Sequence, residues 1–227
     1  MVFRDSVQSS MIISLIVQLI IFAISVKTQY IRVESKDIIL KDALFLENIV
    51  QFVEICFYVW FATILSKQIG ASNIAKYRYM DWILTTPTMI LSTIAYFHYN
   101  NIESKTGFRI HEFAKSNWKT ICKLFAYNWC MLLVGYLQEL NVISVISSTI
   151  VGFTCFGLLF YGMYHNYASL SLKNVPVFTV MFLLWASYGI VSLNSNKTKN
   201  ILYNVLDVFS KNFYGLFLVY TIRNLEI

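Results

Sequence analysis

The chain has 227 residues, of which 57% are hydrophobic and only 13% are charged. Soluble domains are closer to half apolar, so this composition excludes an ordinary soluble protein and indicates a membrane protein. The net charge of +6 is spread over the predicted loops, which argues against a nucleic-acid partner. Because only two prolines and eight glycines interrupt the chain, we expect long helices rather than a barrel, in one membrane domain over residues 1–227.

Seven apolar runs follow one another along the chain, and each is long enough to cross a bilayer as a helix, which takes roughly 20 residues. They cover residues 7–27, 43–66, 77–98, 118–138, 141–164, 175–194 and 201–222. The predicted fold is therefore an all-α, multi-pass bundle of seven transmembrane helices. The sequence has no phosphate loop, no nucleophile elbow and no metal-ligand spacing of histidine and cysteine, so we expect neither an enzyme nor a metal site.

The basic residues predict how the bundle is oriented. Seven spans place the two ends of the chain on opposite sides of the membrane. With the N-terminus outside, the inner side holds Lys27, Arg32, Lys36, Lys41, Lys105, Arg109, Lys115, Lys119, Lys123, Lys173 and Arg223. The outer side then holds Arg4, Lys67, Lys76, Lys197 and Lys199. This excess of inner positive charge agrees with the positive-inside rule, so we expect the N-terminus outside.

The first two runs carry polar residues that repeat at helical spacing. Ser14 and Gln18 are four residues apart in the first run, and Gln51 lies between two glutamates in the second. Glu47 and Glu54 are seven residues apart, so they share one face of a helix at two depths. Such stripes can serve as hydrogen-bonding contacts between helices. Two intramembrane glutamates are more than such contacts require, and acidic side chains along a polar seam make a path for cations.

The third and seventh runs contain charged residues in the middle of the membrane. In "RYMDWILTTPT", Arg78, Asp81 and Thr85 lie on one stripe, and in "LDVFSKN" Asp207 and Lys211 are four residues apart on one face. A charge at the centre of a span costs on the order of 2.5–3.5 kcal/mol on insertion scales, so such residues are usually functional. An ion-pair network that only joins helices is the alternative.

A buried lysine amine has a specific chemistry, because it can condense with an aldehyde to give a Schiff base. If the imine is protonated, it needs an anion close by in the low dielectric of the site. Asp81 and Asp207 can supply two carboxylates, and Arg78 can keep both ionised. Aromatic residues that could line a slot for a long apolar cofactor are Trp82, Trp185 and Tyr188.

Three motifs resemble those of the microbial (type 1) rhodopsins, in the same order and on the same helices. "RYMDWILTTP" is similar to their helix-three signature, "WASY" to their helix-six ring-packing motif and "LDVFSK" to their retinal-lysine signature. The resemblance covers the whole chain. It implies a retinal photoreceptor, with all-trans retinal attached to Lys211 and with counterions formed by Asp81 and Asp207, together with Arg78 and Thr85.

The same resemblance implies a set of residues around the polyene. It places Trp82, Thr86, Met131, Trp185 and Tyr188 against retinal, and it sets Asn128 opposite Thr86. Two positions depart from the pattern of outward proton pumps. Ser92 stands eleven residues after Asp81, where such pumps usually carry a carboxylate, and Lys199 stands twelve residues before Lys211, where they place a glutamate.

The polar positions on helices one, two and seven resemble the group 1 viral rhodopsins of giant algal viruses. The matching residues are Ser14, Gln18, Glu47, Glu54, Lys199, Asn200, Asn204 and Asn212. This resemblance implies a light-gated cation channel, with monovalent cations or protons as the transported ions. The alternative is an outward proton pump in which Glu47 replaces the missing donor, and a photosensor with a partner protein is a third class. A homo-oligomer is compatible with each.

Overall fold

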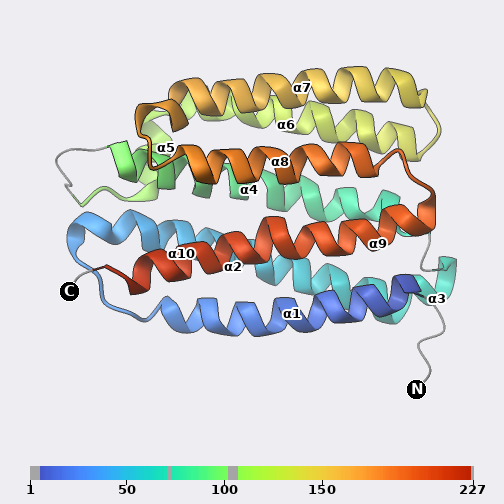
Figure 1. Cartoon of the computed structure of the whole chain (residues 1–227), viewed down its shortest axis with the longest axis horizontal. Coiled ribbons are helices and arrows are strands. Elements are labelled where there is room, and N and C mark those ends of the chain that lie inside the picture. The colour runs from blue at the N-terminus through green and yellow to red at the C-terminus, as the bar shows by residue number, and fades with distance from the viewer. Residues whose placement is uncertain (1–5, 71–72, 102–106, 226–227) are drawn as a thin grey trace.

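The computed structural model describes residues 6–70, 73–101 and 107–225, and the regular structure in these ranges is entirely helical. Its helices are α1 (Ser6–Thr28), α2 (Ile38–Trp60), α3 (Ser66–Ile69), α4 (Ala75–Asn101), α5 (Ile110–Ser116), α6 (Trp118–Glu139), α7 (Val145–Asn166), α8 (Val175–Val191), α9 (Asn196–Asp207) and α10 (Phe213–Arg223). A π-helical turn at Phe61–Leu65 joins α2 to α3, and a second at Val208–Asn212 joins α9 to α10. The long helices lie side by side (Figure 1), which confirms the predicted all-α fold.

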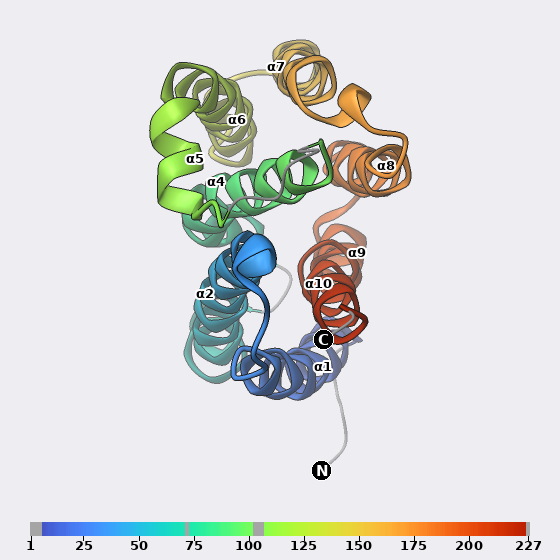
Figure 2. The same ribbon diagram turned by 90° about the vertical axis from the view of Figure 1, so that its left-hand side faces the viewer.

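The described helices form seven columns that close into a ring. Consecutive columns contact one another in the order α1, α2, α4, α6, α7, α8 and α9–α10, and the last contacts α1 again. Figure 2 looks along the bundle and shows this ring, with α7 on the side opposite α1. Residues at the two ends of the chain's helical part are thereby brought together, because α1 packs against both α9 and α10.

Helix α1 illustrates how the side chains are distributed in the bundle. Gln18 is fully buried and Ser14 is 3% exposed, whereas Ile13 and Ile20 are 61% and 56% exposed. Apolar side chains on the outside can face lipid at no cost, while polar side chains must find partners among the other helices. Glu54 of α2 is likewise fully buried. The polar stripes of the sequence therefore point into the bundle.

Four helical stretches of the described residues are long and apolar enough to cross a membrane by length and composition alone. They are Ser6–Thr28, Ser35–Ile69, Trp118–Glu139 and Val145–Leu170, and Val175–Val191 is apolar but shorter. The two other columns, α4 and α9–α10, stand in the same ring and carry Arg78, Asp81, Asp207 and Lys211, all of them buried. These charged residues lower the hydropathy of the two columns. The chain is an integral, multi-pass membrane protein.

Three helix starts differ by four or five residues from those predicted. Helix α2 begins at Ile38 and α9 at Asn196, each five residues earlier than the apolar runs, because polar residues at a membrane surface can remain helical. Helix α7 begins at Val145, four residues later. Asn141 has a positive φ of 59°, which interrupts the helical backbone between α6 and α7. The Ser144 side chain caps α7 by accepting a hydrogen bond from the Ser147 N–H at 3.1 Å.

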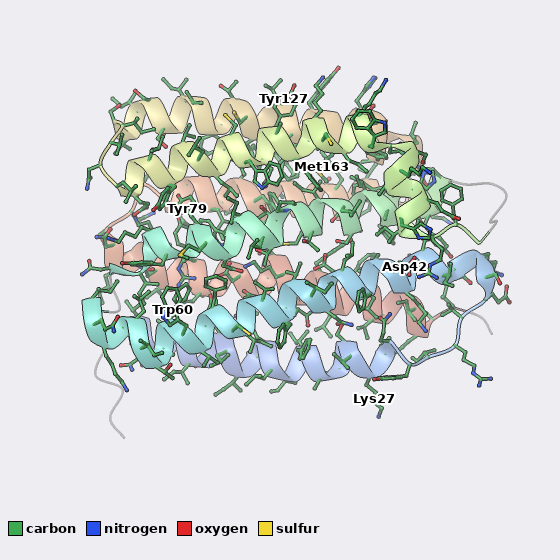
Figure 3. The ribbon with its side chains drawn as sticks, turned by 180° about the vertical axis from the view of Figure 1, so that it is seen from behind. Lys27, Asp42, Trp60, Tyr79, Tyr127 and Met163 are labelled. Atoms are coloured by element: carbon green, nitrogen blue, oxygen red, sulfur yellow. The ribbon has the colours of Figure 1, made fainter. Side chains whose placement is uncertain are left out.

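The short helix α5 was not part of the predicted set. Arg109, just before it, binds Asp42 of α2 through two nitrogens at 2.7 and 3.0 Å, which tethers this segment to the bundle. We call this end, where α1 and α10 finish, the basic end, and the opposite end the N-terminal end. Figure 3 shows Lys27 and Asp42 at the basic end and Trp60 toward the N-terminal end. Two of the counted basic residues, Arg4 and Lys105, lie outside the described residues.

Candidate functional site

The amine of Lys211 lies in the middle of the bundle, surrounded by carboxylates from three columns. The side chain is 2% exposed, and Nζ lies 2.6 Å from Oδ2 of Asp81 on α4. It also lies 3.6 Å from Oε1 of Glu54 on α2 and 3.8 Å from Oδ1 of Asp207. The structure thus brings together the predicted lysine and both predicted counterions. Glu54, expected in the ion path, joins the same group.

The backbone around Lys211 is not a regular α-helix. The residue lies within the π-helical turn Val208–Asn212, between α9 and α10. A π turn adds one residue to the helical repeat, so it rotates the side chains that follow relative to those before it. This places the amine against Asp81 on another helix rather than directly against Asp207, one turn earlier on its own helix. Such π turns are frequent at functional sites.

Asp207 is held by three donors from three different columns. Tyr58 donates to Oδ2 at 2.7 Å, Tyr188 donates to Oδ1 at 2.8 Å, and Nη1 of Arg78 donates to Oδ2 at 3.1 Å. The Tyr188 hydroxyl also lies 2.7 Å from the hydroxyl of Ser210. Sequence reasoning missed Tyr58 and Ser210. Tyr58 is four residues after Glu54 and so shares its helical face, a signal that could have revealed it.

Arg78 extends this network toward the N-terminal end of the bundle. Its Nη2 donates to the Asn204 side-chain oxygen, and its Nε donates to the Asn200 side-chain oxygen at 3.3 Å. The Ser14 hydroxyl donates to the Asn204 backbone carbonyl at 2.7 Å, which connects α1 to the network. The amide of Asn204 donates further to the Ser10 hydroxyl at 2.8 Å. Helices α1, α2, α4 and α9 are therefore joined by direct hydrogen bonds on this side of the lysine.

On the other side of the lysine the buried polar groups are far less completely paired. Asn212 donates to Oε2 of Glu54 at 3.3 Å, but its own oxygen accepts no hydrogen bond among the described residues. Gln18 and Gln51 are fully buried, and neither amide has a hydrogen-bond partner in the described part of the chain. A Cβ at Gly215 would collide with the Gln51 amide, so this glycine makes the space in which that amide lies.

Glu47 lies closer to the basic end and contacts α4. The Ser92 hydroxyl donates to Oε1 of Glu47, and Oε2 has no partner among the described residues. The structure therefore places Glu47 beside Ser92, the position where outward pumps usually carry a carboxylate. On α1, Ser25 donates to the side-chain oxygen of Asn48 at 2.5 Å near the same level.

A cavity beside Lys211 is lined by the residues that the microbial-rhodopsin motifs single out. Its walls include Trp82, Thr86, Met131, Trp185, Tyr188 and Lys211. The Asn128 amide donates to the Thr86 hydroxyl at 2.8 Å, as expected for this pair. Two glycines open the cavity, since a Cβ at Gly189 would come within 2.7 Å of the Phe153 ring and one at Gly135 within 2.6 Å of the Tyr79 hydroxyl.

Two of the predicted site residues have different contacts from those around the lysine. The Thr85 hydroxyl is buried, and it donates to the backbone carbonyl of Asp81 at 3.0 Å rather than to a carboxylate. Lys199 forms a largely buried ion pair with Glu139 of α6, with Nζ and Oε1 2.5 Å apart. Glu139 was not predicted, because it is the last residue of its helix and follows the predicted span 118–138.

The chain is similar to several proteins of known structure. No curated protein matches the chain by sequence. The viral rhodopsin OLPVRII is 27% identical with a TM-score of 0.82, over 98% of this chain and 100% of that one. The thermophilic rhodopsin from Rubrobacter xylanophilus is 17% identical with a TM-score of 0.73, over 96% of both chains, which shows the fold alone.

A light-driven proton pump from Leptosphaeria maculans shares the fold in the same way. It is 16% identical with a TM-score of 0.69, over 99% of this chain and 97% of that one. The resemblance to the microbial rhodopsins is thus confirmed, with a viral rhodopsin among the similar structures. Because the family model for bacteriorhodopsin-like proteins matches residues 7–225, the chain belongs to this family, the microbial rhodopsins, which bind a retinal chromophore in the membrane.

Proposed function

We propose that the protein is a photoreceptor that carries all-trans retinal on Lys211 and acts as a light-gated cation channel. Retinal supplies the absorption of light and the change of shape that follows it. The residues around Lys211 fit this cofactor, because an aromatic slot leads to a single amine. Oδ1 of Asp81 is buried with no hydrogen-bond partner among the described residues, which leaves it free to face a cation on the lysine nitrogen.

The charged groups around the amine hold it in a fixed electrostatic field. Asp81 and Asp207 supply negative charge within 2.6 and 3.8 Å of Nζ, and in a low dielectric such contacts favour a protonated nitrogen. Arg78 and two tyrosines hold Asp207 in place. Tyr188 and Trp185 pack the cavity wall next to the amine. This arrangement supports the role of the two aspartates as counterions.

The network on the N-terminal side of Lys211 suits a closed gate. Direct hydrogen bonds join Ser14, Tyr58, Arg78 and Asn204, so each of these side chains has a partner among the described residues. A cation would have to separate these groups to pass. Movement of the α9–α10 column, to which both Lys211 and Asn204 belong, would do so.

The observation that carries the channel proposal is the polar seam on the other side of the lysine. We define this seam by Gln18, Gln51, Glu54 and Asn212, which belong to α1, α2 and the second π turn. All four are fully buried, and each has at least one atom that makes no hydrogen bond to a described residue. Buried polar groups in native proteins are paired, and where protein offers no partner ordered water does. The seam is therefore a place for water, and a hydrated seam is what a cation needs.

The position of Gln18 follows from its neighbours on α1. Ser14, one turn before it, contacts Asn204 on the N-terminal side of the lysine, and Ser25, two turns after it, contacts Asn48 toward the basic end. Gln18 thus lies at a depth between these two levels. We infer that the basic end faces the cell interior, in line with the positive-inside rule. The seam then forms the inner half of the path.

An outward proton pump is the second candidate, and one contact favours it. Glu47 accepts a hydrogen bond from Ser92, so a carboxyl group lies where the helix-three carboxylate of outward pumps is missing. Glu47 can then return a proton to the lysine nitrogen from the basic side. The same carboxyl group also suits a channel, in which it would contribute negative charge at the inner mouth.

Photocurrent measured against voltage in asymmetric sodium separates the two functions. For a channel, we expect the current to reverse near the sodium equilibrium potential and to move with the sodium gradient. An outward current at every voltage that ignores sodium would contradict the channel and support the pump. The absence of any photocurrent in a protein with a full visible band would leave a sensor as the remaining class.

A further inference from the structure

A second cavity lies between α8 and the last column, on the basic side of Trp185. It measures about 310 Å³, and its walls come from α4, α8, the second π turn and α10. It is separate from the polar seam, since none of the four seam residues lines it. The lining is almost entirely apolar or aromatic. At this size it reaches the range of small-molecule sites, which are concave and mostly apolar.

This cavity extends from the lipid-facing surface to the core. Its walls include Val180, Phe209 and Phe213, which are 58%, 47% and 42% exposed. They also include Met89 and Trp185, which are only 2% and 8% exposed. Because exposed and buried residues line one space, the space opens toward lipid between α8 and α10. The rings of Phe209 and Phe213 stand edge to face at the surface, with centroids 4.9 Å apart.

The second cavity also adjoins the cavity that contains Lys211. Met89, Trp185 and Ser210 line both. Ser210 directly precedes the lysine in the chain, so the inner end of the second cavity lies one residue from the reactive amine. The side chains of Met89, Trp185 and Ser210 thus form a wall that the two spaces share.

We propose that this second cavity is the lateral entrance through which retinal reaches Lys211 from the bilayer. The inference rests on the proposed attachment of retinal to Lys211. The amine is 2% exposed, so a cofactor cannot reach it without passing between helices. Retinal is a long apolar aldehyde that dissolves in the hydrocarbon core, and an apolar passage from that core admits it without exposing it to water. The polar network toward the N-terminal end offers no such passage.

The test is the rate at which apoprotein, prepared without retinal, acquires its visible band after all-trans retinal is added. Val180→Trp should slow the appearance of the band by about tenfold, because a bulky ring at the mouth overfills the passage. The matched control is Leu183→Trp, on the same helix and 57% exposed but not part of either cavity wall. Its rate should equal that of the wild type. Both variants should reach the same final band, because neither residue lines the Lys211 cavity.

A second variant tests the entrance in the opposite direction and does not depend on a bulky substitution. Phe213→Ala removes a half-exposed ring from the mouth, so the band should appear several times faster, with its final height and wavelength unchanged. If Val180→Trp does not fold, the rate of band formation in Phe213→Ala decides whether the cavity is the entrance. Equal rates in wild type, Val180→Trp and Phe213→Ala would contradict the proposal that the cavity is the entrance. The cavity would then be assigned to a lipid acyl chain.

The proposed function is judged separately by the final band. A wild-type protein that never forms a band would contradict retinal binding itself, whereas full bands at equal rates would contradict only the entrance.

Discussion

The Lys211 amine is 2.6 Å from Asp81 on another helix, yet 3.8 Å from Asp207 on its own column. Asp207 instead accepts hydrogen bonds from Tyr58, Tyr188 and Arg78. The two aspartates are therefore not equivalent. Asp81 makes the direct contact with the amine, and Asp207 contributes negative charge from within a hydrogen-bonded network.

This asymmetry predicts that Asp81→Asn changes the colour of the retinal-bound protein more than Asp207→Asn does. Removing the nearer carboxylate lowers the excitation energy of a protonated chromophore and shifts absorption to the red, or else deprotonates the chromophore and moves absorption to the ultraviolet. Lowering the pH of the wild type should reproduce the red shift as Asp81 takes up a proton. Spectra recorded over a pH series check this. An unchanged spectrum in both experiments would assign the counterion role to Asp207 alone.

Lys211→Ala should abolish the visible band when all-trans retinal is added. No other described lysine is buried next to the aromatic cavity, so no other amine is available for attachment there. The measurement is the absorption spectrum after unbound retinal is washed away. Lys199→Ala serves as the control, because this buried lysine pairs with Glu139 and should leave the band in place. A band in Lys211→Ala that survives washing would contradict the attachment site.

Glu54→Gln and Glu47→Gln should have different effects on transport. Glu54 lies in the polar seam, 3.6 Å from the lysine amine, so its replacement should change cation selectivity or gating. Glu47 lies beside Ser92 nearer the basic end, so its replacement should slow recovery of the dark state while current persists. Photocurrents at two pH values check both. If Glu47→Gln instead nearly stops transport at neutral pH while Glu54→Gln matters little, the protein is a pump.

Gly215→Ala should reduce the photocurrent without changing the colour of the protein. An alanine Cβ would collide with the Gln51 amide and force that side chain to move within the seam. Gly157→Ala is the matched control, because a Cβ at this position on α7 meets no other atom within 4 Å. It should keep full current and gain up to about 1 kcal/mol of stability, since alanine is the better helix former. Equal currents in the two variants would show that the seam does not carry the ion.

Tyr58→Phe should weaken the network around Asp207. The change removes a buried donor at 2.7 Å, and losing such a bond costs on the order of 1–3 kcal/mol, because an acceptor stays buried without its partner. We expect a lower midpoint of thermal unfolding and a measurable dark current, since Tyr58 also contacts Asn204 in the closed gate. Tyr220→Phe, on a side chain that is 69% exposed, should change neither.

The amino-acid sequence by itself determined the fold class, the family and most of the candidate site. Apolar runs of membrane length set the helices, because lipid requires each span to satisfy its own backbone hydrogen bonds. The spacing of polar residues then decided which side chains face inward, because an α-helix repeats every 3.6 residues. In this way Asp81, Lys211 and the aromatic residues of the cavity could be identified before any contact was known.

Only the tertiary structure decided how these groups are paired. The π turn at Val208–Asn212 departs from the regular helical repeat, so the distances from Lys211 to its carboxylates could not follow from that repeat. The contacts of Tyr58 with Asp207, of Glu139 with Lys199 and of Ser92 with Glu47 join residues that are far apart in sequence. A one-dimensional pattern gives each residue a face and a depth but not a partner, because the partner depends on how neighbouring helices are rotated and shifted against one another.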